Sequence, residues 1–407
     1  VQAIETARTL NKEERMNAII KALRSASISG IALVFLVAFS SPAFARNLYV
    51  SNDYIGVESG TQVVFDDFIV TVGQNAFGKI IDAYRNSEEG DAIYLAAGTY
   101  TEIDQGGFRD YLFVKHSISL IGAQAGVDAR NREGAKETII ESMGEIIFEK
   151  GSVVVDGIYF KKIRDLKTTA GVTDMQIVNC ITEWIPGFQL ASPGSLVMAN
   201  SSFRDRISIS PCDSVVFTDN AVSSNITFDG IQDLLIERSS MLSIVVNECP
   251  GAILKNIDVL GDVKITNSDT VLLDNLAVRL LKENSYPPYA EWTNGNAVFV
   301  SNSTEVVIKN SALVGCEEVY NAWPDGVEEG MPRGIFFSNS HSCEAYMIAI
   351  SEFGAGVEID SSSYSIRVAN CSFIENDIAV LLDGSDSVVH GCHIELIYGA
   401  TAFMIGE

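Results

Sequence analysis

A polar residue directly after a short apolar strand pattern recurs about every nineteen positions through the middle of this chain. Seven of these positions, which we call stations, are separated by 21, 19, 19, 18, 19 and 35 residues, and apolar side chains stand four and two positions before most of them. Alternation inside a fixed repeat predicts short strands, each stacked on its copy one turn later. The stations are Asn179, Asn200, Asp219, Arg238, Asn256, Asn275 and Asn310.

A turn of about twenty residues has room for two or three strands and tight corners, but not for a helix. The expected fold is therefore all-β, a single-stranded parallel β-helix whose rhythm returns at Asn370 and Gly391. Asparagine suits a corner because it tolerates the left-handed backbone region, and stacked amides can bond one another along the axis. The general frequency of asparagine in turns would explain each residue but not their even spacing.

The first 45 residues predict a signal peptide rather than part of the fold. Met16 opens a segment with two basic residues, an apolar run at 28–39 and an Ala-x-Ala ending at Ala45. This pattern is typical of a secretory signal peptide, 16–45, cleaved after Ala45, and it makes 1–15 an upstream extension. A transmembrane anchor is the alternative, but the run is shorter than the roughly 18–20 residues that span a bilayer. We expect a secreted protein, periplasmic or extracellular, with no membrane span in its mature form.

The chain is strongly acidic, with 53 Asp and Glu against 28 Lys and Arg and a net charge of −25. Such a surface repels nucleic acid and anionic membranes, and it disfavours a polyanionic ligand unless cations bridge the two. Solubility alone also explains a charge of this size.

Seven cysteines are spread along the repeats, often beside a station. Equivalent positions on successive turns stack about 4.8 Å apart, so we expect buried free thiols that pack as small apolar side chains rather than disulfides. Cys371 and Cys392 are the pair best placed to test this. No Cys-x-x-Cys or Cys/His metal spacing is present.

The N-terminal segment, 46–92, differs from the repeats. Apolar residues at 77, 80, 81 and 84 follow helical spacing and predict one amphipathic helix near 75–86. An open solenoid end exposes strand edges and core, so we expect this helix to cap the β-helix of 93–407.

The residues that follow the predicted helix resemble a known group. Residues 90–102 read Gly-Asp-x-Ile-x-Leu-x-x-Gly-x-Tyr-x-Glu, and 119–123 with 137–140 supply a second block. Both are similar to the opening of right-handed parallel β-helix proteins of the pectin-lyase-like superfamily. The resemblance implies a right-handed parallel β-helix but selects no activity, because the group includes polysaccharide lyases, pectin esterases, glycoside hydrolases, epimerases, phage tailspikes and surface proteins without a known reaction.

Two insertions, 282–297 and 316–334, interrupt the later repeats and are expected to be neighbours if they leave from equivalent corners. Aromatic faces stack on sugar rings and carboxylates bond hydroxyls, so the insertions predict a polysaccharide-binding groove. The alternative is that the aromatic residues merely pin two long loops onto the solenoid. The predicted binding residues are Tyr286, Tyr289, Trp292, Tyr320 and Trp323.

The insertions also hold candidate catalytic groups. Glycoside hydrolysis needs two carboxyl groups, one as acid and one as base or nucleophile. Lyase chemistry needs a basic side chain beside a uronate, for which Arg333 is available. Known reaction signatures are mostly missing, among them Arg-x-Pro-x-x-Arg, Gly-His-Gly and Asp-Pro-His-Asp. The candidate catalytic residues are Glu291, Asp325, Glu328, Glu329 and Arg333.

We predict no metal or cofactor site. His390 and His393 are three apart in a strand, which puts them on opposite faces, and His341 stands near the second insertion. Acidic pairs such as Glu88–Glu89 and Glu317–Glu318 offer oxygen ligands for Ca²⁺, but no spaced Asp/Asn loop supports that ion.

Two hypotheses follow. The first is a secreted β-helix protein that engages polysaccharide or a cell-surface glycan through the face around 282–334, as a binder or as a hydrolase or lyase. The second is a non-catalytic adhesive or structural solenoid. An enzyme should place two carboxylates within roughly 5–10 Å of each other in a groove, whereas an adhesin needs no such convergence. Substrate, linkage and oligomeric state stay open.

Overall fold

The computed structural model describes residues 45–101, 111–132, 136–141, 144–191, 194–280, 295–315, 332–383, 386–395 and 401–405. The chain divides into two units, Val1–Arg46 and Asn47–Glu407, and the second contains all the described helices and strands.

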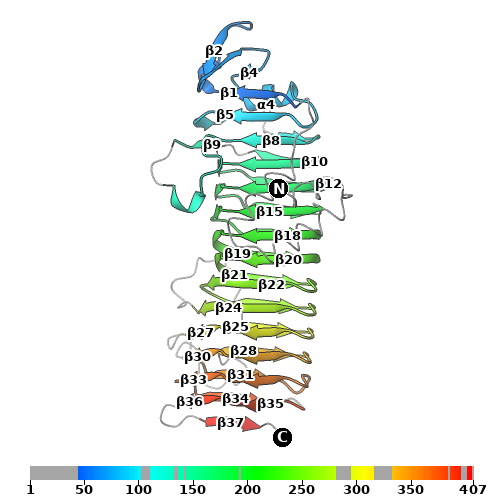
Figure 1. Cartoon of the computed structure of the whole chain (residues 1–407), viewed down its shortest axis with the longest axis vertical. Coiled ribbons are helices and arrows are strands. Elements are labelled where there is room, and N and C mark those ends of the chain that lie inside the picture. Colours follow the sequence, from blue (N-terminus) through cyan, green and yellow to red (C-terminus); the bar gives the residue numbers. More distant parts are fainter. Residues whose placement is uncertain are drawn as a thin grey trace, which may run out of the picture. The chain divides into compact units, whose positions relative to one another are not determined.

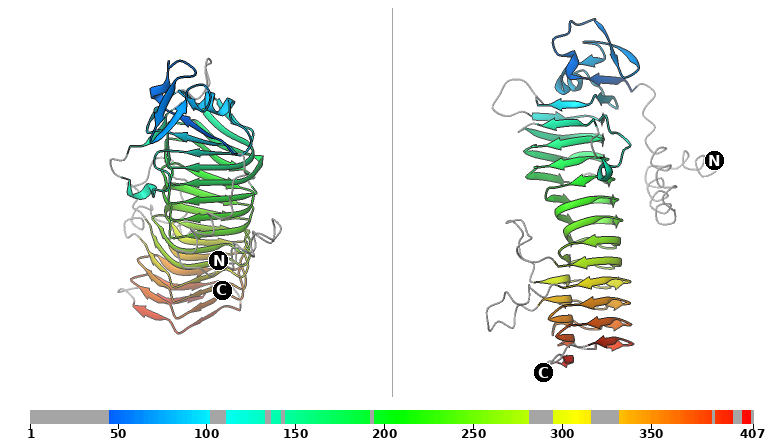
Figure 2. Two further views of the ribbon diagram at one scale, coloured as in Figure 1. Left: turned by 45° about the horizontal axis from the view of Figure 1, so that its top comes forward. Right: turned by 90° about the vertical axis from the view of Figure 1, so that its left-hand side faces the viewer.

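Parallel strands of successive turns stack on three faces, A, B and C, around one core, and 35 of the described strands form one sheet (Figures 1 and 2). Face A consists of β7 (Tyr111–Val114), β14 (Gly187–Ala191), β17 (Ile207–Ser210), β23 (Val263–Thr266), β25 (Asn296–Ser301), β28 (Arg333–Ser338), β31 (Ala355–Ile359), β34 (Ile378–Leu382) and β37 (Thr401–Ile405). Face B consists of β4 (Ala76–Phe77), β1 (Asn47–Val50), β5 (Ala92–Leu95), β8 (Ile118–Ile121), β15 (Ser195–Ala199), β18 (Cys212–Thr218), β20 (Ile231–Glu237), β26 (Val307–Lys309), β29 (Glu344–Tyr346), β32 (Arg367–Ala369) and β35 (Val388–His390).

Face C is built from shorter strands, and six long strands bend across a corner between two faces. Face C consists of β6 (Gly98–Tyr100), β9 (Thr138–Glu141), β11 (Ile158–Lys161), β13 (Ile181–Glu183), β16 (Ser202–Phe203), β27 (Ala312–Val314), β30 (Ala349–Ser351), β33 (Ser372–Ile374) and β36 (His393–Glu395). The bent strands are β10 (Glu145–Asp156) and β12 (Asp165–Val178) from A to B, β22 (Ile253–Val259) and β24 (Leu272–Arg279) from B to C, and β19 (Ala221–Asp229) and β21 (Ser240–Asn247) from C to A.

Inward side chains alternate with outward ones and form one continuous apolar core along the stack. Phe188, Phe203, Phe217 and Phe228 illustrate its packing, with successive ring centroids 5.7, 6.3 and 5.7 Å apart. Burying each such ring stabilises the fold by about 1.5–3 kcal/mol relative to an exposed ring. The apolar residues predicted two and four positions before the stations, such as Ile177 and Met175, belong to this core.

The stations occupy the B–C corner, and all seven have a left-handed backbone with φ between 48° and 59°. The predicted corner is thus confirmed. Among the seven stations the predicted amide stacking is found once, where Asn275 Nδ2 donates to Asn256 Oδ1 at 2.7 Å. Asn179 and Asn310 donate to carboxylates instead. On two further turns Gly157 and Met347 occupy this corner with a left-handed backbone, at φ of 71° and 54°. The sequence pattern identified neither residue.

A buried ladder of polar side chains lies just inside this corner, one residue after several of the stations. Cys180 N donates to Ser201 Oγ (3.0 Å), Ser201 N to Asn220 Oδ1 (3.0 Å) and Asn220 N to Ser239 Oγ (3.1 Å). Ser268 and Ser303 form the same kind of ladder at the A–B corner. Buried backbone N–H groups need partners, so these small polar residues let the chain turn without orphaned donors.

The predicted helix is shorter than expected. α4 spans Ile80–Arg85, whereas residues 76–77 form β4, because Phe77 pairs in parallel register with Val50 of β1. The helix packs against β1, β4 and β5. β2 (Gln62–Phe65) and β3 (Phe68–Thr71) form an antiparallel hairpin, and the described residues include two short 3₁₀ helices, η1 (Asn52–Tyr54) and η2 (Ala129–Asn131).

The six described cysteines are free thiols, and five are buried, in agreement with the sequence expectation. Burial raises the pKa of the Cys180 thiol to about 12 and that of Cys371 to about 11. These thiols are therefore protonated at neutral pH and act as small core side chains. Cys316 lies outside the described residues.

Candidate functional site

Both insertions interrupt the chain at the C–A corner. The first runs from β24 to β25 and the second from β27 to β28. β24 pairs with β27, and β25 pairs with β28. At the joins, Leu280 N donates to Val314 O at 3.0 Å and Arg333 N donates to Gly295 O at 3.1 Å. The residues that flank the two insertions are therefore neighbours on successive turns, as the sequence predicts.

Nine of the ten predicted site residues lie outside the described residues, so their roles stay predictions. They are Tyr286, Tyr289, Glu291, Trp292, Tyr320, Trp323, Asp325, Glu328 and Glu329.

Arg333, the tenth, opens β28 where the second insertion returns, and the residue is 8% exposed. Its Nε contacts one carboxylate oxygen of Glu358 on β31, and its Nη2 donates to the other at 3.2 Å. Its guanidinium carbon lies 4.6 Å from the centroid of the Phe336 ring. A carboxylate held through two N–H groups neutralises the guanidinium, so this arginine is not the free cation that lyase chemistry requires.

A row of outward side chains crosses face A beside the insertions. Lys264, Phe299, Phe336 and Glu358 occupy consecutive register positions on β23, β25, β28 and β31, and we call them the wall row. The Phe299 and Phe336 ring centroids are 5.4 Å apart, and Lys264 Nζ lies 5.7 Å from the Phe299 centroid. All four side chains are half-buried. The two rings are tilted by 34° to each other, and neighbouring aromatic rings with adjacent charges form a surface suited to the apolar face of a sugar.

A buried oxygen next to the wall row has no hydrogen-bond partner. Asn296, at the start of β25, pairs in register with Arg333 and is 5% exposed. Its Oδ1 accepts no hydrogen bond. An unsatisfied buried acceptor costs about 1–3 kcal/mol, and it commonly marks the position of a bound water or ligand donor.

The B–C corner carries a second polar site, which sequence reasoning missed. Residues 122–132, which follow β8, form a segment that crosses several stations, and we call this segment the strap. Gly122 N donates to Asp156 O (2.7 Å) and Ala129 N to Asn200 O (2.9 Å), while Arg132 contacts Asn179 O. The sequence feature that could have indicated the strap is the glycine at position 157, because a Cβ there would lie 2.1 Å from Ala125 N of the strap.

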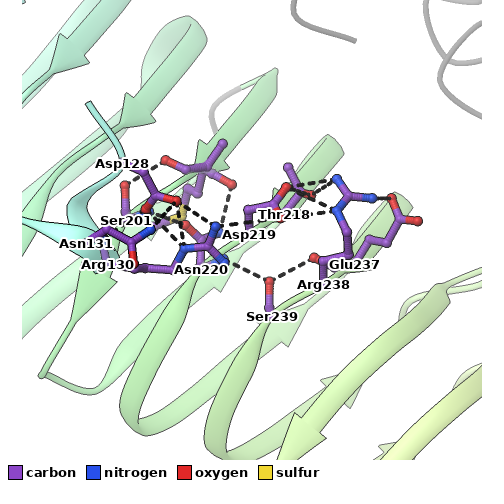
Figure 3. Close-up of polar contacts among 12 residues, drawn as sticks. Asp128, Arg130, Asn131, Ser201, Thr218, Asp219, Asn220, Glu237, Arg238 and Ser239 are labelled. Atoms are coloured by element: carbon purple, nitrogen blue, oxygen red, sulfur yellow. Dashed lines mark hydrogen bonds and ion pairs between the residues drawn. The ribbon is translucent and has the colours of Figure 1, made fainter. Parts of the chain in front are cut away.

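The strap ends in a network of carboxylates and guanidinium groups (Figure 3). Arg130 donates to Asp128 through Nε (3.0 Å) and Nη2 (2.7 Å), and its Nη2 lies 3.8 Å from Asp219 Oδ1. Arg238 Nη2 donates to Asp219 Oδ2 at 2.8 Å, and Arg238 Nη1 lies 2.5 Å from Glu237. One carboxylate, Asp219, therefore links the strap to the station residue of the next turn.

An open depression of about 280 Å³ lies against this network, and its lining is polar. It lacks an aromatic platform, and the carboxylates around it outnumber its two guanidinium groups, so we interpret it as the solvent-filled edge of a structural network. The lining residues are Arg130, Asn220, Arg238, Ser239, Ser240, Asn256 and Asp258.

Asp128 in the strap and Asp156 beneath it have pKa values shifted in opposite directions. Burial raises the pKa of Asp128, but the hydrogen bonds and charge of Arg130 outweigh it, so the net pKa is below the usual range. Burial dominates at Asp156 and raises its pKa despite hydrogen bonds from Asn179 and Gly126. Neither carboxyl lies beside the wall row.

No group of three or more His, Cys, Asp or Glu side chains in the described part of the chain could hold a metal ion. Glu89 instead accepts a hydrogen bond from Ser117 N, and His341 stacks on Tyr364 at 4.8 Å between ring centroids. Among the described residues, no helix is long and apolar enough to cross a membrane.

Comparison with solved structures shows the fold. Tailspike protein 3 of bacteriophage CBA120 is similar to this chain with a TM-score of 0.51 and 10% sequence identity over 77% of the chain. The chain is a parallel β-helix. The expected parallel β-helix fold is confirmed at this level. The chain spans about half of the tailspike, 54% of its length.

Two enzymes with β-helix folds are similar at lower scores. An α-1,3-glucanase catalytic unit from Streptomyces thermodiastaticus matches 89% of this chain and 71% of its own length, with 10% identity and a TM-score of 0.44. A mannuronan C-5 epimerase A-module from Azotobacter vinelandii matches 80% and 93%, with 11% identity and a TM-score of 0.36. No protein-family model and no curated protein sequence matches the chain.

Proposed function

We propose that this protein binds polysaccharide through the side wall where the two insertions meet face A. The observation that carries the proposal is the coincidence of three features at one place. Both insertions leave and return at the same corner of successive turns, the wall row presents two neighbouring phenylalanine rings there, and the buried Asn296 at the start of β25 has an unsatisfied acceptor. The aromatic residues of the insertions add rings whose planar faces stack on sugars.

Binding without catalysis is the better supported form of this proposal. The candidate basic group for lyase chemistry, Arg333, is paired with Glu358 and nine-tenths buried. Hydrolysis would rest on Glu291 with Asp325, Glu328 or Glu329. Assays for new reducing ends and for unsaturated products, over a panel of neutral and uronate glycans, distinguish hydrolase, lyase and binder.

The binding test uses the two tryptophans of the insertions. We expect Trp292→Ala and Trp323→Ala to lose retention in polysaccharide affinity gels while the thermal unfolding midpoint stays close to that of the wild type. Trp184→Ala is the matched control, since this tryptophan is 54% exposed at a C–A corner without an insertion. Unchanged retention in both insertion variants would exclude this surface as the binding site.

Two further roles belong to the same proposal. The sequence of residues 16–45 supports secretion, with cleavage after Ala45 placing the protein in the periplasm or outside the cell; intact-mass measurement of the secreted chain tests the cleavage site. The buried Ile80 and Ile81 of α4 support a capping role at the N-terminal end of the stack.

A further inference from the structure

We propose that two copies of this chain associate through face B, with their solenoid axes antiparallel. This association goes beyond the proposed function and does not depend on it, because face A and its wall row stay free in both copies. Two features of face B support the proposal: aliphatic side chains on its outer surface, and the pattern of charges beside them.

Face B carries aliphatic side chains on its outside as well as in the core. On six successive turns the outward residue at one register position is aliphatic and half-buried. The first five strands that carry this position, β15, β18, β20, β22 and β24, are adjacent rungs of the stack in Figure 1. We call these residues the aliphatic column: Val197, Val216, Leu235, Ile253, Leu272 and Val307.

The sequence of these strands has the pattern of a sheet that is covered on both sides. Residues 196–198, 215–217 and 234–236 are uninterrupted apolar triplets. A sheet with one solvated face shows alternating apolar and polar residues, whereas near-continuous apolar runs are typical of strands buried on both faces. The outward column of face A on the same six turns is polar at four positions, so the apolar exterior is specific to face B. That column of face A consists of Gln189, Ser208, Thr227, Val245, Lys264 and Phe299.

Charged residues border the aliphatic column on both sides. Two residues after the column, four consecutive register positions alternate in sign, and Lys309 Nζ lies 3.4 Å from a carboxylate oxygen of Asp274. Two residues before the column, Asp233 and Glu305 are exposed. The alternating row consists of Glu237, Lys255, Asp274 and Lys309.

These charges select a second copy with an antiparallel axis as the occupant. A two-fold axis that runs along the strands, midway between Leu235 and Ile253, places every member of the aliphatic column opposite another member. The same axis places Glu237 of each copy opposite Lys255 of the other, and no like charges face each other within the column and its two borders. Parallel axes would instead place Glu237 opposite Asp233 of the second copy, an unfavourable pair of like charges.

The size of the aliphatic column predicts a weak dimer. Five steps of about 4.8 Å make it about 24 Å long, and three outward positions about 7 Å apart make the face about 14 Å wide. The product, about 340 Å² per copy, is less than half of the roughly 800 Å² that each partner buries in a stable complex. The net charge of −25 also opposes association at low salt. We therefore expect a dissociation constant on the order of 10–100 µM at moderate salt.

Sedimentation velocity of the purified protein, from about 1 to about 300 µM in about 0.15 M salt, tests the proposal. We expect the wild type to shift from monomer to dimer over this range. Leu235→Lys places charges at the centre of the interface and should raise the dissociation constant at least about tenfold. Thr227→Lys is the matched control, because Thr227 is an outward, half-buried residue of face A. A wild type that stays monomeric throughout, or unchanged association in a folded Leu235→Lys variant, would overturn the proposal.

A charge exchange tests the antiparallel arrangement. Glu237→Lys and Lys255→Glu should each weaken association about tenfold, because each places like charges opposite one another, and the double variant should restore it. Parallel axes predict the reverse for Glu237→Lys, since the new lysine would face Asp233 of the second copy. Folding of each variant is checked by its unfolding midpoint. A folded double variant that associates as weakly as the single variants would overturn the antiparallel pairing, and if Leu235→Lys does not fold, the wild-type series and the charge variants decide.

Discussion

The B–C corner and the C–A corner join the same kind of strands but differ in what they contain. At the B–C corner a single left-handed residue turns the chain on each turn from Gly157 onward, and a buried polar ladder satisfies part of the backbone behind it. At the C–A corner β19 and β21 bend across without a connection, Glu352 to Gly354 form a connection of three residues, and two turns carry the long insertions.

This difference indicates how a solenoid separates stability from recognition. A corner whose residues are fixed by backbone conformation and internal hydrogen bonds leaves little freedom for a binding surface. A corner that tolerates both short and long connections can vary without disturbing the stack, because each turn contacts only its neighbours. Substitutions should therefore reduce stability at the B–C corner and binding at the C–A corner.

The largest effect on stability is expected at the station that the strap crosses. Gly157→Ala introduces a Cβ that would lie 2.1 Å from Ala125 N, at a φ of 71°. We expect a loss of about 3 kcal/mol in the free energy of unfolding, measured by denaturant titration. Gly126→Ala is the control, since its φ is 74° but a Cβ meets nothing within 4 Å. It should cost only about 1 kcal/mol, the backbone penalty alone. Equal losses in the two variants would show that the strap moves aside freely.

A smaller loss should follow removal of the carboxylate that links the strap to the stations. Asp219→Asn leaves Arg130 and Arg238 without their shared partner, and we expect about 1–3 kcal/mol of destabilisation. Asp258→Asn, an exposed carboxylate at the same depression, should change the unfolding free energy by less than about 0.5 kcal/mol. Polysaccharide retention should be the same in both variants, and its loss in either would move the binding site to this corner.

The ladder inside the A–B corner should behave like that of the B–C corner. Ser303 is fully buried, accepts from Ser268 N at 3.1 Å and donates to Ser301 O at 2.8 Å. Ser303→Ala should cost about 1–2 kcal/mol by leaving a buried N–H without a partner. Ser301→Ala, which points outward on face A, is the control and should be nearly neutral. Similar losses of unfolding free energy in the two variants would mean that water, rather than the Ser303 hydroxyl, satisfies the buried N–H group.

The smallest expected effect is a pH dependence of the unfolding free energy, which arises from Asp128 in the strap and Asp156 beneath it. The folded-state pKa of Asp128 is lowered, so its contribution is present above the usual aspartate pKa and is lost as the pH falls through the folded value. The pKa of Asp156 is raised, so stability instead falls as the pH rises from the usual pKa through the folded one. In a profile of unfolding free energy against pH, Asp128→Asn should reduce the loss of stability on acidification. Asp156→Asn should instead remove the loss of stability that accompanies rising pH. Identical profiles for both variants would refute this assignment.

The regular repeats could be predicted from the sequence because residues close together in the chain determine their strands and corners. An alternating pattern that ends at Asn200 or Asn275 specifies a strand and a left-handed corner without reference to distant contacts. Met347 was missed because its side chain gives no such signal, and it adopts the same conformation only because its turn must match its neighbours. The helix start was misplaced because Phe77 satisfies helical spacing but is used for strand pairing with Val50.

The site was predicted only in outline. The location of both insertions followed from the interrupted rhythm, whereas their proximity was expected only on the condition that they leave from equivalent corners. The pairing of Arg333 with Glu358 did not, because these residues are 25 positions apart and meet only through the register of β28 and β31. Phe299 and Phe336 carry no motif in the sequence, and the contact between their rings likewise depends on three-dimensional register.

The central claim is that the C–A insertions bind and the rest of the stack supports them, and removing both insertions tests it most directly. The register equates Val314 with Ser351 and Arg333 with Ala355, so Glu352-Phe353-Gly354 can replace 315–332, and the same three residues can replace 280–295. We expect the doubly shortened protein to unfold cooperatively near the wild-type midpoint and to show no polysaccharide retention in affinity gels. A folded variant that still binds as strongly as the wild type would contradict the account.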